Sequence, residues 1–190
     1  MNREESESEE ERWIAGCSLG ERDAQRKIFA GLFPYLKGAV RRYIFDEDEI
    51  EDVLQEAFIR IFQSLNQFDS QKGSLRAWAA RIAINVAITQ GKKRKRNQEL
   101  PGQKDLDLGP SVIESMALND LIAILKCMPS DQYEVLSLHI IDGYSHKEIS
   151  KILEINEELS RQRLTRARKW VMKRFKLSGG ELVPLIQTLQ

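Results

Sequence analysis

Three polar side chains, Asp52, Gln55 and Glu56, recur at helical spacing opposite the apolar residues of the segment that carries them. Two carboxylates and an amide arranged in this way can contact the basic side of a partner helix. The same strip can also be a surface that faces only water, and taken alone it favours that simpler interpretation. The choice between a partner-binding surface and a solvated surface therefore depends on the residues that follow in the chain.

A second set of polar residues joins an amide to a cluster of cations. Arg81 and Asn85 lie in a helical pattern over residues 75–90, and the basic run Lys92-Lys-Arg-Lys-Arg96 follows directly. Clustered lysines and arginines neutralise phosphates, and an amide can pair with the edge of a base. This continuity favours a nucleic-acid surface, with a hydrogen bond inside the domain as the alternative role for Asn85.

A third set lies near the C-terminus, in a helical pattern that begins at Glu157 and whose inner face is expected to consist of Leu164, Ala167, Val171 and Phe175. Its candidates for DNA contact are Leu159, Arg161, Gln162, Arg163 and Arg166. A glutamine can pair with adenine, arginines bind guanine edges or phosphates, and a leucine can contact a thymine methyl group. The sequence does not decide between base and phosphate for each arginine.

The chain lacks the residue patterns of an enzyme or of a metal site. Cys17 and Cys127 are far apart, and His139 and His146 do not complete a zinc-ligand set. There is no phosphate-binding glycine loop and no nucleophile with a neighbouring base. A metal-dependent nuclease built on the carboxylates of residues 46–56 is disfavoured, because those acids alternate with apolar core positions. We expect no catalytic residues, no metal and no cofactor.

Composition sets the broad class of protein. The 190 residues are 42% hydrophobic, which suits two small domains as well as one, and the net charge is zero. The charges are segregated, however, with acidic runs at 4–11 and 46–56 and basic runs at 92–96 and 161–176. Two separate basic patches predict two nucleic-acid contacts. Because no apolar run could span a bilayer and no signal peptide is evident, we expect a cytoplasmic protein without membrane insertion.

The first half of the chain predicts one helical domain over residues 20–96. Residues 1–19 form an acidic tail that we expect to be disordered. Apolar residues then follow one helical face up to Tyr43, with a kink or interruption at Pro34. An acidic turn at 46–49 leads to a helix over 51–65. After a loop at 66–74, Ser74 is expected to cap the helix 75–90.

The second half predicts a helix-turn-helix domain over residues 113–176, which makes the whole chain all-α with two small helical domains. A flexible linker over 97–112 and a helix from Ile113 precede a helix that starts at Pro129-Ser130. The pattern Ser145-His-Lys-Glu148 predicts a capping box, and a three-residue turn at 154–156 separates its helix from the long basic helix after it. The apolar tail 177–190 is expected to cover the core of this domain.

These motifs carry a resemblance to a known family. The segment DVLQEAFIRIF, then LNQFDSQKGSLRAWAARIAIN, then a basic run, resembles region two of the extracytoplasmic-function (ECF) group of bacterial RNA polymerase sigma factors. The segments GYSHKEISKILEIN and RQRLTRARKWV resemble region four of the same family. Departures occur where the family usually has glycine, here Glu154, and at Glu158-Leu159-Ser160, where Ser160 occupies a position expected to be buried and apolar.

The resemblance implies a role for each set of residues. It implies that core RNA polymerase is bound through the clamp helices of its largest subunit and through its flap region. The residues implied for the clamp helices are Asp52, Gln55, Glu56 and Phe62. Those implied for the minus-ten element of promoter DNA are Phe68, Lys72, Ser74, Arg81, Asn85, Lys92, Lys93 and Arg94. Those implied for the minus-thirty-five element are Leu159, Arg161, Gln162, Arg163 and Arg166.

The family role is transcription initiation without catalysis by the factor itself, and it leaves open whether an anti-sigma factor restrains the protein. The alternative from another class is a stand-alone helix-turn-helix regulator, in which residues 20–90 form a dimerisation or effector domain. Capture of core polymerase separates the two, because only a sigma factor requires it.

Overall fold

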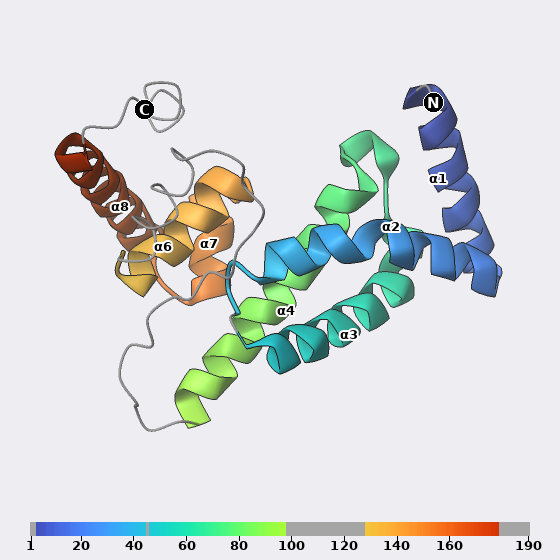
Figure 1. Cartoon of the computed structure of the whole chain (residues 1–190), viewed down its shortest axis with the longest axis horizontal. Helices are drawn as coiled ribbons and strands as arrows, with labels where there is room; N and C mark the ends of the chain where they lie inside the picture. Colours follow the sequence, from blue (N-terminus) through green and yellow to red (C-terminus); the bar gives the residue numbers. More distant parts are fainter. Residues whose placement is uncertain (1–2, 45, 98–127, 179–190) are drawn as a thin grey trace. The chain divides into compact units, whose positions relative to one another are not determined.

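The computed structural model describes residues 3–44, 46–97 and 128–178 (Figure 1). All regular elements in these three ranges are helical, as the sequence predicts. The chain divides into two compact units, residues 1–97 and 98–190. No helix within the described ranges is long and apolar enough to cross a membrane. The predicted linker and the helix predicted from Ile113 lie outside the described residues, as does the tail from Gly179 onward.

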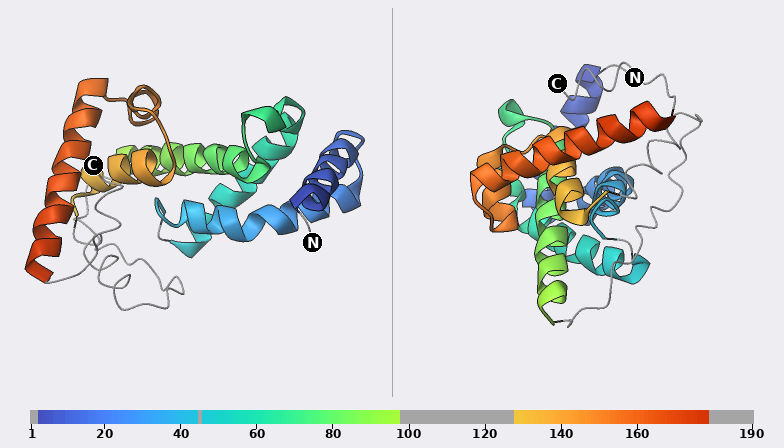
Figure 2. Two further views of the ribbon diagram at one scale, coloured as in Figure 1. Left: turned by 90° about the horizontal axis from the view of Figure 1, so that it is seen from above. Right: turned by 90° about the vertical axis from the view of Figure 1, so that its left-hand side faces the viewer.

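The first unit is built on three helices that pack on one another, α2 (Arg22–Val40), α3 (Glu47–Ser64) and α4 (Leu75–Asn97). In Figures 1 and 2, α4 crosses α2 at an angle, and it packs against both α2 and α3. In α2, the core residues recur every fourth position: Ile28, Leu32, Leu36 and Val40 are buried. This spacing confirms the predicted helical face. The helix continues through Pro34, so the predicted interruption does not occur.

The start of α3 corrects the predicted acidic turn. Asp46 caps the helix, with its carboxylate accepting hydrogen bonds from the backbone amides of Asp48 and Glu49 at 3.1 and 3.2 Å. The other acids of the segment form the first helical turn, where negative charge is favoured by the unpaired amides and the helix dipole. The predicted core face is confirmed, because Val53, Leu54, Ala57, Phe58 and Ile61 are buried.

Two short 3-10 turns, η1 (Leu65–Gln67) and η2 (Ser70–Lys72), connect α3 to α4. Ser74 then caps α4, accepting a hydrogen bond from the Ala77 amide at 3.3 Å, as the sequence predicts. The helix is longer than predicted, since it passes Gln90 and ends at Asn97. Lysine and arginine are strong helix formers and are favoured near a helix C-terminus, so the basic run extends the helix.

The N-terminal segment also differs from the expectation of disorder, because residues Arg3–Ser18 form the helix α1, which packs on α2 and contacts η1. Gly16 is buried where the two helices meet, and a Cβ atom there would lie 2.9 Å from Ala24 Cβ. The Lys27 Nζ atom lies 5.7 Å from the centre of the Trp13 ring. The C-terminal part of α1, around Trp13 and Gly16, therefore packs on α2, and this tertiary packing stabilises a helix that the acidic residues alone would not.

The second unit contains α6 (Ser130–Leu136), the π-helical turn η3 (Ser137–Ile141), α7 (His146–Leu153) and α8 (Glu157–Ser178). The predicted capping box is confirmed, since Ser145 and Glu148 exchange both of its hydrogen bonds. On α8, Leu164, Ala167 and Val171 are buried, as predicted. The fourth predicted core residue of this helix, Phe175, has a side chain outside the described part.

Candidate partner and nucleic-acid interfaces

The carboxylate strip lies on the outer side of α3. Asp52 and Gln55 are exposed, and Glu56 is half-buried and accepts a 2.7 Å hydrogen bond from Arg60 Nε. Ile59, which follows one turn later, is 53% exposed and was not singled out from the sequence. Its position follows from the same helical spacing as the strip, because residue 59 lies four residues after Gln55 and three after Glu56. The strip is therefore a mixed surface of acids, an amide and an aliphatic side chain.

Beside this strip, four phenylalanines form a row across α2 and α3. The ring centres of Phe29 and Phe58 are 4.4 Å apart, those of Phe29 and Phe33 are 5.3 Å apart, and those of Phe58 and Phe62 are 6.1 Å apart. Phe58 is buried and Phe62 is half-buried, whereas Phe29 is 43% exposed. Phe29 is one of the apolar residues of the helical face predicted up to Tyr43, and it lies at the edge of that face instead of in the core.

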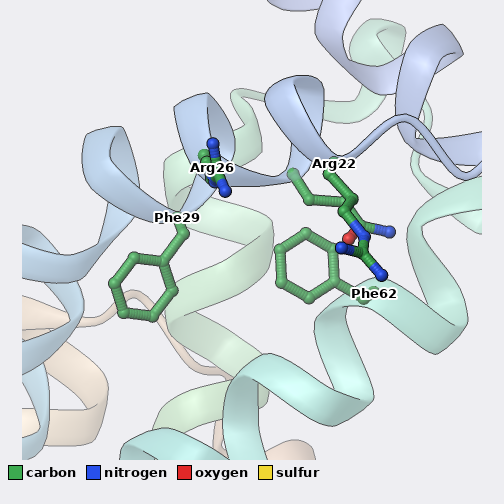
Figure 3. Close-up of a pocket in the computed structure, with 5 residues that line it drawn as sticks. Arg22, Arg26, Phe29 and Phe62 are labelled. Carbon is green, nitrogen blue, oxygen red and sulfur yellow. The ribbon is translucent and has the colours of Figure 1, made fainter.

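The row ends at an open hollow of about 360 Å³ between α2 and α3 (Figure 3). It is lined by Arg22, Gln25, Arg26, Phe29 and Phe62. Figure 3 shows the Phe62 ring, from α3, next to the Arg22 side chain, from α2. Aromatic surface next to cationic and amide groups can accept an apolar side chain of a partner and hydrogen-bond to its surroundings.

The loop before α4 holds three of the predicted minus-ten residues. The rings of Phe68 and Trp78 are 5.6 Å apart and both are half-buried. Lys72 Nζ lies 2.9 Å from Asp69 Oδ2. This contact and the hydrogen bond from the Gln71 amide lower the pKa of Asp69. Ser74, the third residue, has its hydroxyl engaged in capping α4.

The outer side of α4 carries the predicted amide and part of the predicted cationic set. Arg81 and Asn85 are exposed one turn apart and Lys93 is exposed, whereas Lys92 is half-buried and its Nζ atom is buried. The Asn85 side-chain amide makes no hydrogen bond to any other described residue, and Thr89 Oγ1 binds the Asn85 backbone carbonyl at 2.7 Å. Arg94 continues the helix, with its side chain outside the described part. An amide that faces water in this way is available to a base edge.

In the second unit, α7 and α8 are joined by the predicted three-residue turn. Glu154 ends α7 in the left-handed conformation, with φ 57° and ψ 42°, a backbone conformation that glycine most often adopts at the end of a helix. Asn156 then caps α8, its Oδ1 accepting a 2.6 Å hydrogen bond from the Leu159 amide. Two helices joined so tightly have the geometry of a helix-turn-helix, in which the second helix enters the major groove.

The exposed polar residues at the start of α8 are joined in pairs. Arg161 Nη2 lies 3.0 Å from Glu157 Oε2, and Gln162 Nε2 donates to Glu158 Oε1 at 3.3 Å. Arg166 is exposed as well. These side chains lie together on the outer side of α8, where they can reach a duplex.

Two residues of the same predicted set lie elsewhere. Leu159 is half-buried, although the helical pattern places it on the outer side. Arg163 points toward α6, where its Nε lies 3.2 Å from Asp131 Oδ2. No periodicity argument could have shown that pairing, because it joins residues from different helices.

Comparison with known proteins agrees with this arrangement. Residues 28–97 match the family described as Sigma-70 region 2, and residues 118–171 match Sigma-70, region 4. The chain is 30% identical over 149 residues to the ECF RNA polymerase sigma factor SigX of Bacillus subtilis, covering 73% of this chain and 76% of that protein. The chain belongs to the ECF sigma factors. Members of this family bind core RNA polymerase and direct promoter recognition, minus-ten melting and transcription initiation, and this protein is such a sigma factor.

Two further comparisons concern the same sigma factor family. The ECF RNA polymerase sigma-E factor of Escherichia coli K12 is 28% identical over 145 residues, which cover 68% of this chain and 75% of that one. A solved structure titled as the sigma factor RpoE with the anti-sigma factor NepR, from Bartonella quintana, has a TM-score of 0.55 at 21% identity. It covers 80% of this chain and 96% of that chain, and it supports the same fold.

Proposed function

We propose that this sigma factor docks on the clamp helices of the largest polymerase subunit through Asp52, Gln55, Glu56 and Phe62. The strip on α3 offers negative charge to a basic helix, and charge complementarity of this kind directs encounter and register. The half-buried Phe62 adds apolar surface next to it, and buried aromatic anchors supply much of the affinity of protein interfaces. The exposure of Asp52 and Gln55 beside this aromatic side chain is the observation that carries the proposal.

The docking is tested by size-exclusion chromatography of the chain with bacterial core polymerase. Replacing Asp52, Gln55 and Glu56 together with alanine should abolish co-elution. The matched control replaces Glu9, Glu11 and Gln67, two acids and one amide that are exposed on α1 and η1. The control should co-elute as the unmodified chain does. Equal loss in both triple variants would indicate a general charge effect and would contradict docking through α3.

The minus-ten element is assigned to the outer side of α4 and to residues 68–74 of the loop before it. Asn85 offers a base edge two donors and an acceptor, while Arg81, Lys72, Lys92, Lys93 and Arg94 supply charge for the flanking phosphates. Phe68 offers an aromatic face, and Ser74 a hydroxyl, at the start of the same helix. Holding a base out of the stack costs a few kcal/mol, so a preformed site with these groups favours the opened strand.

Permanganate reactivity of promoter thymines tests this assignment. Asn85→Ala should reduce opening by holoenzyme, because the unstacked base loses its amide partner. On a template with a pre-opened bubble, the defect should shrink, since less of the opening energy then has to come from binding. Asn66→Ala, which removes an exposed amide from η1, is the control and should open the promoter normally. Equal opening by both variants would exclude a role for Asn85.

The minus-thirty-five element is assigned to the start of α8, through Arg161, Gln162 and Arg166. These three side chains are exposed and can reach base edges or phosphates in a major groove, whereas Leu159 is half-buried and Arg163 is paired with Asp131. We include the flap region of polymerase as a partner of this unit. We also include an anti-sigma factor, the class of protein bound to the structural neighbour from Bartonella quintana. The factor is proposed to act in the bacterial cytoplasm by binding, with no catalytic step of its own.

A further inference from the structure

Two histidines and a buried serine meet where the two helices of the helix-turn-helix begin. The rings of His139, from η3, and His146, the first residue of α7, are stacked with centres 4.5 Å apart and planes 16° apart. His146 Nδ1 lies 2.8 Å from Ser160 Oγ on α8, and His139 Nδ1 lies 2.7 Å from the Tyr144 carbonyl oxygen. This cluster joins three elements of the second unit.

Ser160 is the member that the helical pattern does not explain. It is fully buried, at a position of α8 where the pattern calls for an apolar side chain. A buried hydroxyl without a partner is costly, and His146 is the side chain that meets this need. The bond connects the first turn of α7 to the first turn of α8. Ser160 also lies between Leu159 and Arg161, so whatever holds Ser160 also holds the turn assigned to DNA.

The surroundings of His146 favour its neutral form. Burial is the main cause of a lowered pKa, and the nearby His139 on η3 and Arg161 and Arg168 on α8 lower it further. Glu157, also on α8, acts in the opposite direction. On α7 itself, the Glu148 carboxylate is engaged by Ser145 in the capping box. At neutral pH the imidazole is therefore uncharged and can bond to Ser160 without repulsion from the stacked ring.

We propose that His146 is a positioning residue for promoter recognition, which fixes the reading turn of α8 through Ser160 and releases it when the His146 imidazole becomes charged. This inference rests on the proposed contact of α8 with the minus-thirty-five element. In the charged form, the His146 imidazolium and the guanidinium groups of Arg161 and Arg168 repel one another within a partly buried cluster. The first turn of α8 then loses its fixed position against α7, and upstream recognition weakens while the contacts of the first unit remain.

The sign of the pH effect follows from the lowered pKa. When α8 is held against α7, His146 binds a proton less readily than when the first turn of α8 is released. The held arrangement is therefore fully favoured above the ordinary histidine pKa of about 6.5. Its advantage decreases as the pH falls below that value and through the lowered pKa of His146. Upstream recognition should therefore be pH-dependent on the acidic side of neutrality.

The test measures initiation by holoenzyme on two promoters that differ only in an intact or replaced minus-thirty-five element. The ratio of the two rates cancels pH effects on polymerase itself. From about pH 7.5 to about pH 5.5, the ratio should fall at least about twofold for the unmodified factor. His146→Gln, which can still bond to Ser160 but does not titrate, should keep the ratio at neutral pH and abolish its fall. The same fall with His146→Gln would overturn the proposal.

A second pair of variants separates positioning from general stability. Ser160→Ala removes the bond, and Ser150→Ala removes a hydroxyl that bonds only to the Lys147 carbonyl of its own helix. At neutral pH, Ser160→Ala should lower the promoter ratio and Ser150→Ala should not, with helicity by circular dichroism unchanged in both. Equal ratios for the two would also overturn the proposal. Absence of any initiation or of any upstream dependence would instead contradict the proposed function on which the inference rests.

Discussion

Arg163 and Asp131 form an ion pair between α8 and α6, with Arg163 Nε 3.2 Å from Asp131 Oδ2. The Arg163 side chain is 21% exposed, whereas the Asp131 side chain is 45% exposed. Arg166, only three residues further along α8, is exposed. Helical periodicity gives no reason to distinguish the two arginines, but their surroundings differ. Arg163 is held in an ion pair between two helices, whereas Arg166 is accessible to a ligand.

This difference predicts opposite effects of two substitutions. Arg163→Ala should lower the free energy of unfolding of the second unit by up to about 1 kcal/mol, because it breaks a partly exposed ion pair. Arg166→Ala should leave stability unchanged and weaken promoter binding in a salt-dependent way, through loss of a phosphate or base contact. Urea unfolding and DNA titration of holoenzyme at two salt concentrations measure the two effects. The reverse pattern would contradict this division.

Replacing Glu154 should stabilise the second unit. The left-handed backbone conformation of this residue is energetically unfavourable for a residue with a Cβ atom, whereas glycine adopts it with little strain. Glu154→Gly should therefore raise the free energy of unfolding by up to about 1 kcal/mol. Lys151→Gly, an exposed position inside α7, is the control and should lower it by about 1 kcal/mol. Thermal unfolding of both variants checks the prediction, and a destabilised Glu154→Gly chain would contradict it.

Gly91 tests whether the basic run is part of α4. It lies inside the helix, and a Cβ atom there would meet Ile44 Cδ1 at 3.9 Å, an ordinary contact. Gly91→Ala should stabilise the helix by about 0.5–1 kcal/mol. Gly143→Ala should instead destabilise its unit, because Gly143 has a φ angle of 71°. Helicity and unfolding temperature distinguish the outcomes, and a loss of stability with Gly91→Ala would indicate that the helix ends earlier.

Acid should weaken the junction between α2 and α3. Hydrogen bonds from Lys37 and Arg41 lower the pKa of Glu47, with Lys37 Nζ 3.1 Å from its Oε2 atom. The resulting stability is present above the ordinary carboxylate pKa and is lost as the pH falls through the lowered value. Glu47→Gln should therefore reduce the acid sensitivity of unfolding. Glu51→Gln, an exposed position one turn along α3, should leave it unchanged, and an equal effect of both would contradict the assignment.

Local patterns in the sequence predict much of this structure. The caps at Ser74 and Ser145 follow from side chains that bond to backbone amides a few residues away. The buried faces of α2, α3 and α8 follow from helical periodicity. What could not be predicted depends on contacts between elements: α1 is ordered against α2 at Gly16, Phe29 lies at the edge of the core, and Ser160 meets His146 across two helices.

Some partners of the candidate site residues also depend on contacts between helices, which the sequence does not give. The sequence grouped Arg161, Gln162, Arg163 and Arg166 by type and position. Helical spacing accounts for the partners of Arg161 and Gln162, which lie four residues earlier on the same helix, but it gives no partner for Arg163. Asp131, which holds Arg163, lies on another helix and far away in the sequence. Asn85 could have bonded within its domain, and only the structure shows its amide on the outer side of α4. Exposure and pairing at a candidate interface thus come from the tertiary fold.

Whether this factor starts transcription through the docking surface on α3 is decided by mapping the transcripts that core polymerase makes on genomic DNA with this chain added. A defined set of new start sites should appear with the unmodified chain. These starts should be lost when Asp52, Gln55 and Glu56 are replaced with alanine and retained when Glu9, Glu11 and Gln67 are replaced. The contradictory result is a chain that binds the same DNA tightly and selectively without polymerase, while adding no start site to core enzyme.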